Sequence, residues 1–107
     1  MGQKDTEPQV YTLLVELGRK EGDGLPEGAT GGAMMVYASG RDEAEAVRET
    51  VAILKEAGLN PLEVSSYGTM ADRLAEGHEL TERDRELMRR ALEDNAVIVA
   101  ETTPFYD

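Results

Sequence analysis

The sequence predicts an α+β domain, a two-layer sandwich with its helices packed on one face of a sheet of about four strands. Alternating apolar stretches indicate strands near both ends of the chain, and an amphipathic helical pattern occupies its middle. Two further helix starts follow that pattern. The expected order is therefore ββαβααβ, which is ferredoxin-like in general architecture. A length of 107 residues suits one hydrophobic core.

The first part of the chain predicts two strands joined by a glycine-rich loop. Residues 1–8 are polar, and we expect a disordered N-terminal segment before a single domain over 9–107. Alternation over 10–17 is typical of a strand. Residues 33–38 are apolar at every position, as in a strand covered on both faces or paired at an interface. Glycines are frequent over 18–32, which predicts a flexible loop.

The clearest helix is predicted over 41–57. Apolar residues, among them Leu54, fill one half of its helical wheel, and charged residues fill the other. Ser39 or Asp42 can cap its start, and Gly58 favours its end. This helix must therefore bury one face.

A strand over 62–67, with Leu62 and Val64 facing inward, precedes two shorter helices. Each helix is preceded by the pattern Thr-x-x-Asp, at 69–72 and at 81–84. This pattern is typical of a capping box with Asp in place of Glu. The two helices are expected to end near residues 76 and 94.

A last strand is predicted over 96–102, followed by a short tail. With all helices on one face, apolar strand residues such as Tyr11, Met34 and Met35 would lack cover on the other. Such a surface favours a homodimer joined through the sheet face or an edge. The alternative is a monomer in which the glycine-rich loop or the tail covers that face.

The charge of the chain excludes some classes of partner. Asp and Glu number 22 against 11 Lys and Arg, a net charge of −11. Such a charge repels phosphates, so we expect no binding to nucleic acid or to anionic membranes. The longest apolar run, over 96–100, is too short to span a bilayer. Neither a secretory pattern nor a cysteine is present, which favours a cytoplasmic protein.

One candidate ligand site depends on strand direction. If the last three strands were parallel, their carboxyl ends would share one edge of the sheet, where α/β proteins bind ligands. The residues at these ends are Ser39, Arg41, Ser65, Ser66, Tyr67, Thr102 and Thr103. Their hydroxyls and the guanidinium suit a small carboxylate or phosphate. The same hydroxyls are also ordinary capping groups, and acidic residues crowd the nearby helix start.

The other motifs give little indication of catalysis, metal binding or cofactor binding. His78, the only histidine, begins an HExxH-like stretch that has Glu82 in place of the second histidine. Without thiols, we expect no metal site and no cofactor. Tyr67 and His78 are the candidate catalytic residues. The glycine-rich loop precedes a strand rather than a helix, so it does not match a dinucleotide fingerprint.

These observations favour a non-catalytic binding or regulatory module that acts as a homodimer. One alternative is a small enzyme with a small-anion substrate site at the carboxyl ends of the strands. The other is an acidic interaction protein that blocks a basic surface on a partner. The expected partners are accordingly a second copy, a small anionic ligand or a basic protein.

Overall fold

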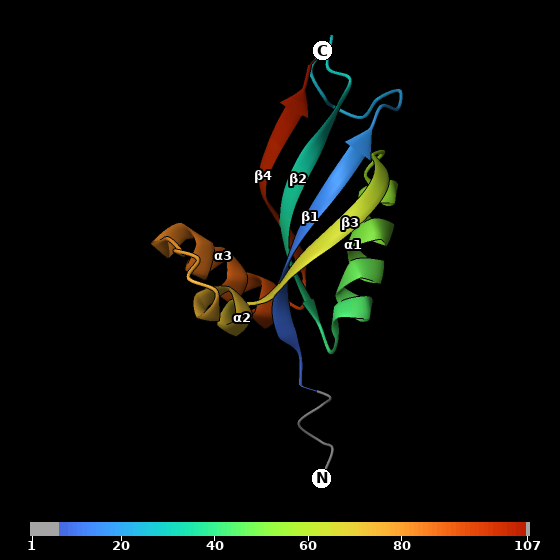
Figure 1. The fold of residues 1–107 in the computed structure, drawn as a ribbon. Helices are drawn as coiled ribbons and strands as arrows, with labels where there is room; N and C mark the ends of the chain where they lie inside the picture. Colours follow the sequence, from blue (N-terminus) through green and yellow to red (C-terminus); the bar gives the residue numbers. More distant parts are fainter. Residues whose placement is uncertain (1–6, 107) are drawn as a thin grey trace.

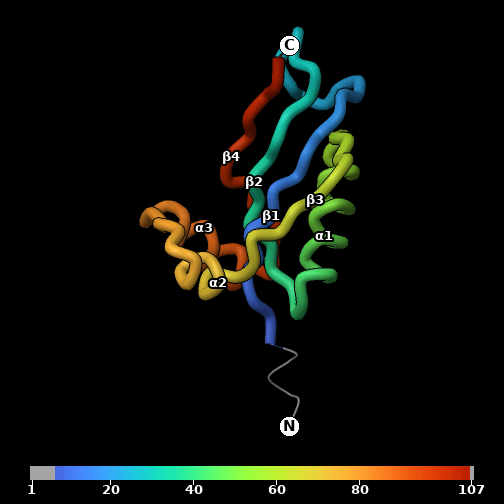
Figure 2. Tube along the Cα trace, viewed as in Figure 1, coloured from blue at the N-terminus to red at the C-terminus, as the bar shows by residue number. Residues whose placement is uncertain are grey.

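A computed structural model describes residues 7–106, which form a four-stranded antiparallel sheet and three helices (Figures 1 and 2). The elements are β1 (Gln9–Gly18), β2 (Gly31–Gly40), α1 (Glu43–Glu56), β3 (Asn60–Thr69), α2 (Met70–Ala75), α3 (Glu82–Glu93) and β4 (Val97–Phe105). The predicted α+β class and ββαβααβ order are confirmed. Most of the segment expected to be disordered, residues 1–6, lies outside the described residues.

The strand order is β3-β1-β2-β4, and every neighbouring pair is antiparallel. β1 and β2 form a hairpin, β3 adds beside β1, and β4 adds beside β2. The connection through α2 and α3 lies at the end of the sheet where β3 stops (Figure 1). β4 therefore enters from that end and runs back against β2. The ferredoxin-like description holds in outline, although the strand order differs slightly.

Helices cover both faces of the sheet, so the expectation that all three pack on one face is wrong. α1 packs on the face that carries Leu13 and Val36, whereas α3 packs on the face that carries Val10 and Tyr37. The reason is the composition of β2, which is apolar on both sides and needs cover on both. Val36 and Tyr37 are each 0% exposed. α2 and α3 lie at one end of the sheet and leave the rest of their face open (Figure 1).

Two predicted details of the edge strands need correction. A register shift in β3 makes Leu62 an extra residue, because Glu63 pairs with Glu16 and Pro61 pairs with Leu17. Such a bulge re-aims the side chain, so Leu62 is 60% exposed rather than inward. The expected tail after residue 102 instead continues β4 to Phe105. An edge strand tolerates the proline at 104, which lacks a hydrogen-bond donor.

The glycine-rich loop folds around a buried carboxylate. Asp23 accepts hydrogen bonds from the backbone nitrogens of Lys20 and Leu25, at 2.8 and 2.9 Å, and from Arg19 Nε at 3.0 Å. Arg19 also donates to two carbonyl groups farther along the loop. These backbone hydrogen bonds, followed by those from Arg19, hold the pKa of Asp23 below its ordinary value of 3.8. The expected mobility of the loop stays a prediction.

A partly buried hydrogen bond joins α3 to the sheet. The Tyr37 hydroxyl donates to Asp84 Oδ1 at 2.8 Å, and Asp84 also forms the capping box of α3 with Thr81. Burial disfavours the charged form of Asp84, but hydrogen bonds from Thr81 and Tyr37 outweigh it and lower the pKa of Asp84 below 3.8. One carboxylate therefore both starts α3 and anchors it on β2.

Replacing Tyr37 by Phe keeps the ring but removes the donor to Asp84. We expect Tyr37→Phe to lower the free energy of unfolding by about 2 kcal/mol, because the partner is charged and partly buried. Urea unfolding followed by circular dichroism measures this change. Tyr106→Phe, at a tyrosine that is 59% exposed, is the matched control. Equal stability of the two variants would contradict the anchoring role.

Acid should destabilise the fold through Asp23 and Asp84. Their pKa values are lowered in the folded state, so their contribution is complete above their ordinary value and is lost as pH falls through the folded pKa. We expect the urea midpoint to fall below about pH 4. The Asp23→Asn/Asp84→Asn double variant should show a flatter pH profile, and Asp94→Asn serves as the control. An unchanged slope in the double variant would refute this assignment.

Candidate functional site

The antiparallel direction of β4 separates the residues expected at one carboxyl edge. Ser39 and Arg41 lie at the end of β2. Thr102 and Thr103 pair with residues in the first half of β2, towards the opposite end of the sheet. The parallel arrangement on which the single site depended is not formed. The seven expected ligand-binding residues therefore do not converge.

The three candidate ligand-binding residues in β3 also lie apart from one another. Ser65 is exposed and lies opposite Leu14 on the face of α2 and α3. Ser66 Oγ accepts a hydrogen bond from the backbone nitrogen of Gly68 at 3.0 Å. Ser66 and Tyr67 line a separate pocket of about 400 Å³, which also holds the carboxylates of Glu43, Asp72 and Glu76. This acidic lining disfavours a small anion.

The two candidate catalytic residues lie together. The rings of Tyr67 and His78 meet edge to face, with centroids 6.3 Å apart and an interplanar angle of 77°. His78 Nδ1 accepts a hydrogen bond from Arg73 Nε at 3.1 Å, and His78 Nε2 lies 3.8 Å from Glu76 Oε1. Arg73 Nη1 also donates to the hydroxyl of the buried Thr12 at 3.3 Å. Arg73 therefore links α2 to β1, and His78 accepts a second hydrogen bond from the same guanidinium.

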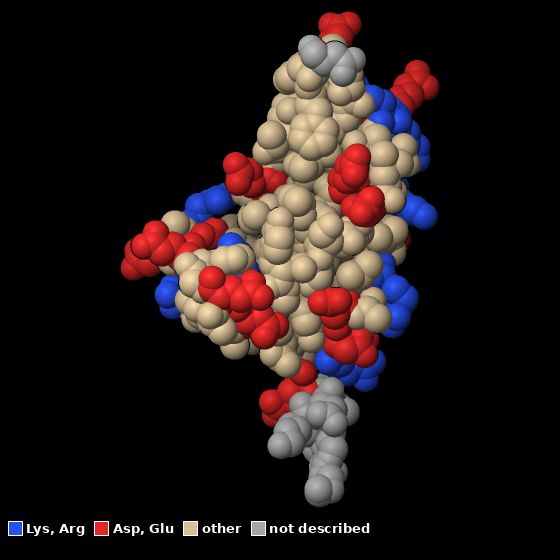
Figure 3. All heavy atoms as spheres, viewed as in Figure 1, with Lys and Arg blue, Asp and Glu red and all other residues tan. Residues whose placement is uncertain are grey.

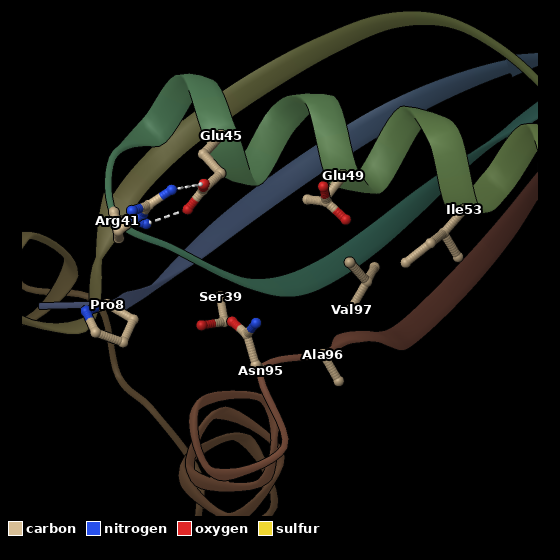
Figure 4. Close-up of a pocket in the computed structure, with 9 residues that line it drawn as sticks. All are labelled: Pro8, Ser39, Arg41, Glu45, Glu49, Ile53, Asn95, Ala96 and Val97. Atoms are coloured by element: carbon tan, nitrogen blue, oxygen red, sulfur yellow. Dashed lines mark hydrogen bonds and ion pairs between the residues drawn. The ribbon is translucent and has the colours of Figure 1, made fainter. Parts of the chain in front are cut away.

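Arg41 is engaged within its own helix start. Its Nη2 lies 3.0 Å from Glu45 Oε2, and its backbone nitrogen donates to Glu45 Oε1 at 2.7 Å. The hydrogen bond from the Arg41 side chain is the main reason that the pKa of Glu45 lies below its ordinary value of 4.5. Both residues line a pocket of about 350 Å³ between α1 and the start of β4 (Figure 4). Since Glu49 also lines it, this pocket disfavours a small anion as well.

A further surface lies where α2 and α3 leave their face of the sheet open. The strand registers place two rows of neighbours across it, Ser65-Leu14-Met35-Glu101 and Glu63-Glu16-Ala33-Thr103. Phe105 follows Thr103 by two residues on β4 and is 42% exposed. We call these nine residues the open sheet face. A hollow of about 300 Å³ lies among six of them, namely Leu14, Glu16, Ala33, Glu63, Ser65 and Phe105.

Acidic side chains on the open sheet face lack cationic partners. Glu16 and Glu63 are exposed and directly opposite each other on neighbouring strands, and neither forms an ion pair within the described residues. Like charges in this position destabilise a sheet. Figure 3 shows acidic groups on both sides of a central uncharged area. Sequence reasoning missed this surface because it depends on the registers of all four strands, although charged residues within apolar strands could have indicated it.

The described residues offer no clear place for a metal or a membrane span. No group of three or more His, Cys, Asp or Glu side chains among them could hold a metal ion. Within residues 7–106, no helix is long and apolar enough to cross a bilayer. Besides the pocket lined by Ser66 and Tyr67, the features for binding described above are the pocket beside α1 and the open sheet face.

Comparisons with known proteins identify a family but no activity. Residues 10–106 match a family described as "Domain of unknown function (DUF8846)". No curated protein and no solved structure matches the sequence significantly. The family match covers nearly all of the residues that make up the sheet and the helices. The chain therefore belongs to the family described as a domain of unknown function (DUF8846).

Proposed function

We propose that this chain is a non-catalytic binding module whose open sheet face docks a protein segment with an apolar centre and basic flanks. The observation that carries the proposal is the direct opposition of Glu16 and Glu63 beside the exposed ring of Phe105. None of the nine residues of the face is basic. A basic partner supplies the missing counter-charges.

The apolar part of the face supports docking by burial. Leu14, Ala33 and Met35 are half-buried, and Phe105 adds an exposed aromatic ring at their side. Covering such a surface contributes about 25 cal/mol per Å² of apolar area removed from water. The surrounding carboxylates orient the partner and speed its association, and they contribute less of the affinity than the apolar contacts do. Apolar contacts at the centre with charges around them are a common arrangement in protein interfaces.

The charge of the face favours a basic partner over a second copy. Face-to-face association of two copies would bring two sets of Glu16, Glu63 and Glu101 into one interface. Like charges placed together across an interface cost several kcal/mol. The net charge of −11 also repels copies at long range. These considerations favour the alternative of an acidic interaction protein over the homodimer that the sequence led us to expect.

The enzyme alternative receives less support. Its small-anion site needed Arg41 as a free cation, whereas that guanidinium is paired with Glu45. Its candidate base, His78, accepts a hydrogen bond from Arg73. We also propose a cytoplasmic location for this binding module, because the lack of cysteine favours one.

A designed peptide tests the docking surface. We expect the capped, fluorescently labelled peptide Lys-Lys-Leu-Phe-Leu-Lys-Lys to bind, with fluorescence anisotropy as the readout. The Glu16→Gln/Glu63→Gln/Glu101→Gln variant should bind about tenfold more weakly.

Glu16→Gln alone should also raise the free energy of unfolding by about 0.5 kcal/mol, because it removes the repulsion across the strands.

Matched controls separate this surface from general charge attraction. The Glu21→Gln/Glu27→Gln/Glu56→Gln variant has the same net charge but keeps the open sheet face, so it should bind like the wild type. The peptide Lys-Lys-Ser-Gly-Ser-Lys-Lys should bind more weakly than the apolar-centred peptide. Equal weakening by both triple variants would overturn the proposal. So would a dimer in analytical ultracentrifugation that Phe105→Lys dissociates, since the face would then belong to a second copy.

A further inference from the structure

We propose a second binding site, for a carboxylate carried on a short aliphatic chain, in the pocket that α2 and α3 form with the start of β1. This pocket of about 360 Å³ falls within the usual size range of small-ligand sites. Figure 1 shows both helices beside the first part of β1. The pocket shares no residue with the open sheet face, so the two proposals can fail separately.

The walls of this pocket are mainly apolar. Val10 and Met88, which line it, are 8% and 1% exposed. The half-buried Met70 lines it from the start of α2, and Leu92, which is 42% exposed, lines it from the second half of α3. An aliphatic chain that covers these side chains removes their apolar surface from water, which is the main source of affinity in such a pocket.

The charge of its lining residues distinguishes this pocket from the others. None of its described lining residues is acidic, and two of them, Arg85 and Arg89, are basic. The hollow in the open sheet face, the pocket beside α1 and the pocket lined by Tyr67 each contain at least two carboxylates. In a chain with 22 acidic and 11 basic residues, two arginines beside an apolar pocket are a local exception that favours an anion.

The two arginines differ in the donors that they have free. Arg89 pairs with Glu86 and Glu93 on its own helix. Arg85 donates from Nε to the carbonyl oxygen of Leu80 at 3.4 Å, but its Nη1 and Nη2 form no hydrogen bond or ion pair within the described part of the chain. A guanidinium binds a carboxylate through two parallel hydrogen bonds, which these two atoms can supply. Arg85 is therefore the carboxylate-binding residue of the site.

The spacing of residues on α3 places the free cation and the apolar wall on one side of the helix. Arg85, Met88 and Leu92 follow one another at intervals of three and four residues, so they share one face. A ligand that lies along α3 therefore places its carboxylate at Arg85 and its chain over Met88 towards Leu92. At physiological ionic strength, charges more than about 8 Å apart are largely screened, so the nearby arginines outweigh the net charge of −11.

Titration of the full chain with hexanoate, followed by amide chemical shifts in NMR at physiological salt, tests the site. We expect saturable shifts at Val10, Met70 and Leu92, and little response to n-hexylammonium at equal concentration. Arg85→Gln should weaken the binding of hexanoate about tenfold, which corresponds to a lost charged hydrogen bond. Arg90→Gln changes the net charge equally at an exposed arginine of the same helix that does not line the pocket, so it should leave binding unchanged.

The length of the ligand chain tests the apolar wall. The dissociation constant should fall about threefold for each methylene group added between acetate and hexanoate, because each buried methylene adds to the hydrophobic gain. Leu92→Ser should reduce this dependence. Equal affinity for acetate and hexanoate, or an unchanged dependence in Leu92→Ser, would overturn the site. Unchanged binding in Arg85→Gln, or a response to n-hexylammonium equal to that of hexanoate, would overturn it as well.

The carboxylate can belong to a free aliphatic acid or to the C-terminus of a protein that ends in an apolar residue. A titration with Nα-acetyl-leucine distinguishes these sources. A stronger response to Nα-acetyl-leucine assigns the group to a protein C-terminus, and a stronger response to hexanoate assigns it to a free acid. Both results support the shared chemistry, whereas no saturable response to either compound refutes it.

Discussion

The fold depends on β2 being buried on both faces. Val36 and Ala38 pack under α1, and Tyr37 between them packs under α3. A strand with apolar side chains on both sides cannot be stable in a two-layer sandwich, because one side would face water. The helices must therefore divide between the two faces. The three helices formed by residues 7–106 leave part of the α3 face uncovered, and the open sheet face lies there.

The position of α3 sets the limits of the open sheet face. Asp84 completes the capping box of α3 with Thr81 and accepts a hydrogen bond from the Tyr37 hydroxyl, so the start of the helix is fixed above β2. Met88 and Ala91 then bury the next turns against the same side of the sheet. Leu14 and Ala33 lie on this side beyond the reach of the helix and remain half-buried. A single polar contact thus helps to decide which apolar residues stay available to a partner.

The sequence was sufficient to predict the local elements, because their causes are local. The apolar stripe that includes Leu54 and the two Thr-x-x-Asp boxes lie within single helices, and the structure confirms both boxes. The misjudged features depend on pairing between distant segments. Leu62 faces outward because a bulge forms opposite Leu17. The direction of β4 depends on where the α2–α3 connection packs, and no residue of β4 itself encodes it.

The candidate site residues show the same division. Ser39 and Arg41 were identified from their place at a strand end, and they do share a pocket. The pairing of Arg41 with Glu45 is visible only in three dimensions, and it makes this pocket less suited to the small anion expected there. The sequence indicated an uncovered sheet face that includes Met35, but the set of residues that make up the open sheet face could not be read from it. Its rows combine residues from four strands, and a shift of one residue in any register would turn its side chains to the other face.

The docking proposal rests on groups whose local interactions are unfavourable in the isolated chain. Glu16 opposes Glu63, and neither forms an ion pair within residues 7–106. Elsewhere in residues 7–106, Asp23 is surrounded by donors and Arg89 is paired with two glutamates, although the buried hydroxyls of Ser39 and Thr50 also lack partners. Local conflicts in an otherwise consistent fold are expected at functional positions. The pair of Glu16 and Glu63 lines a hollow in the open sheet face, and this position is the reason to assign it to binding.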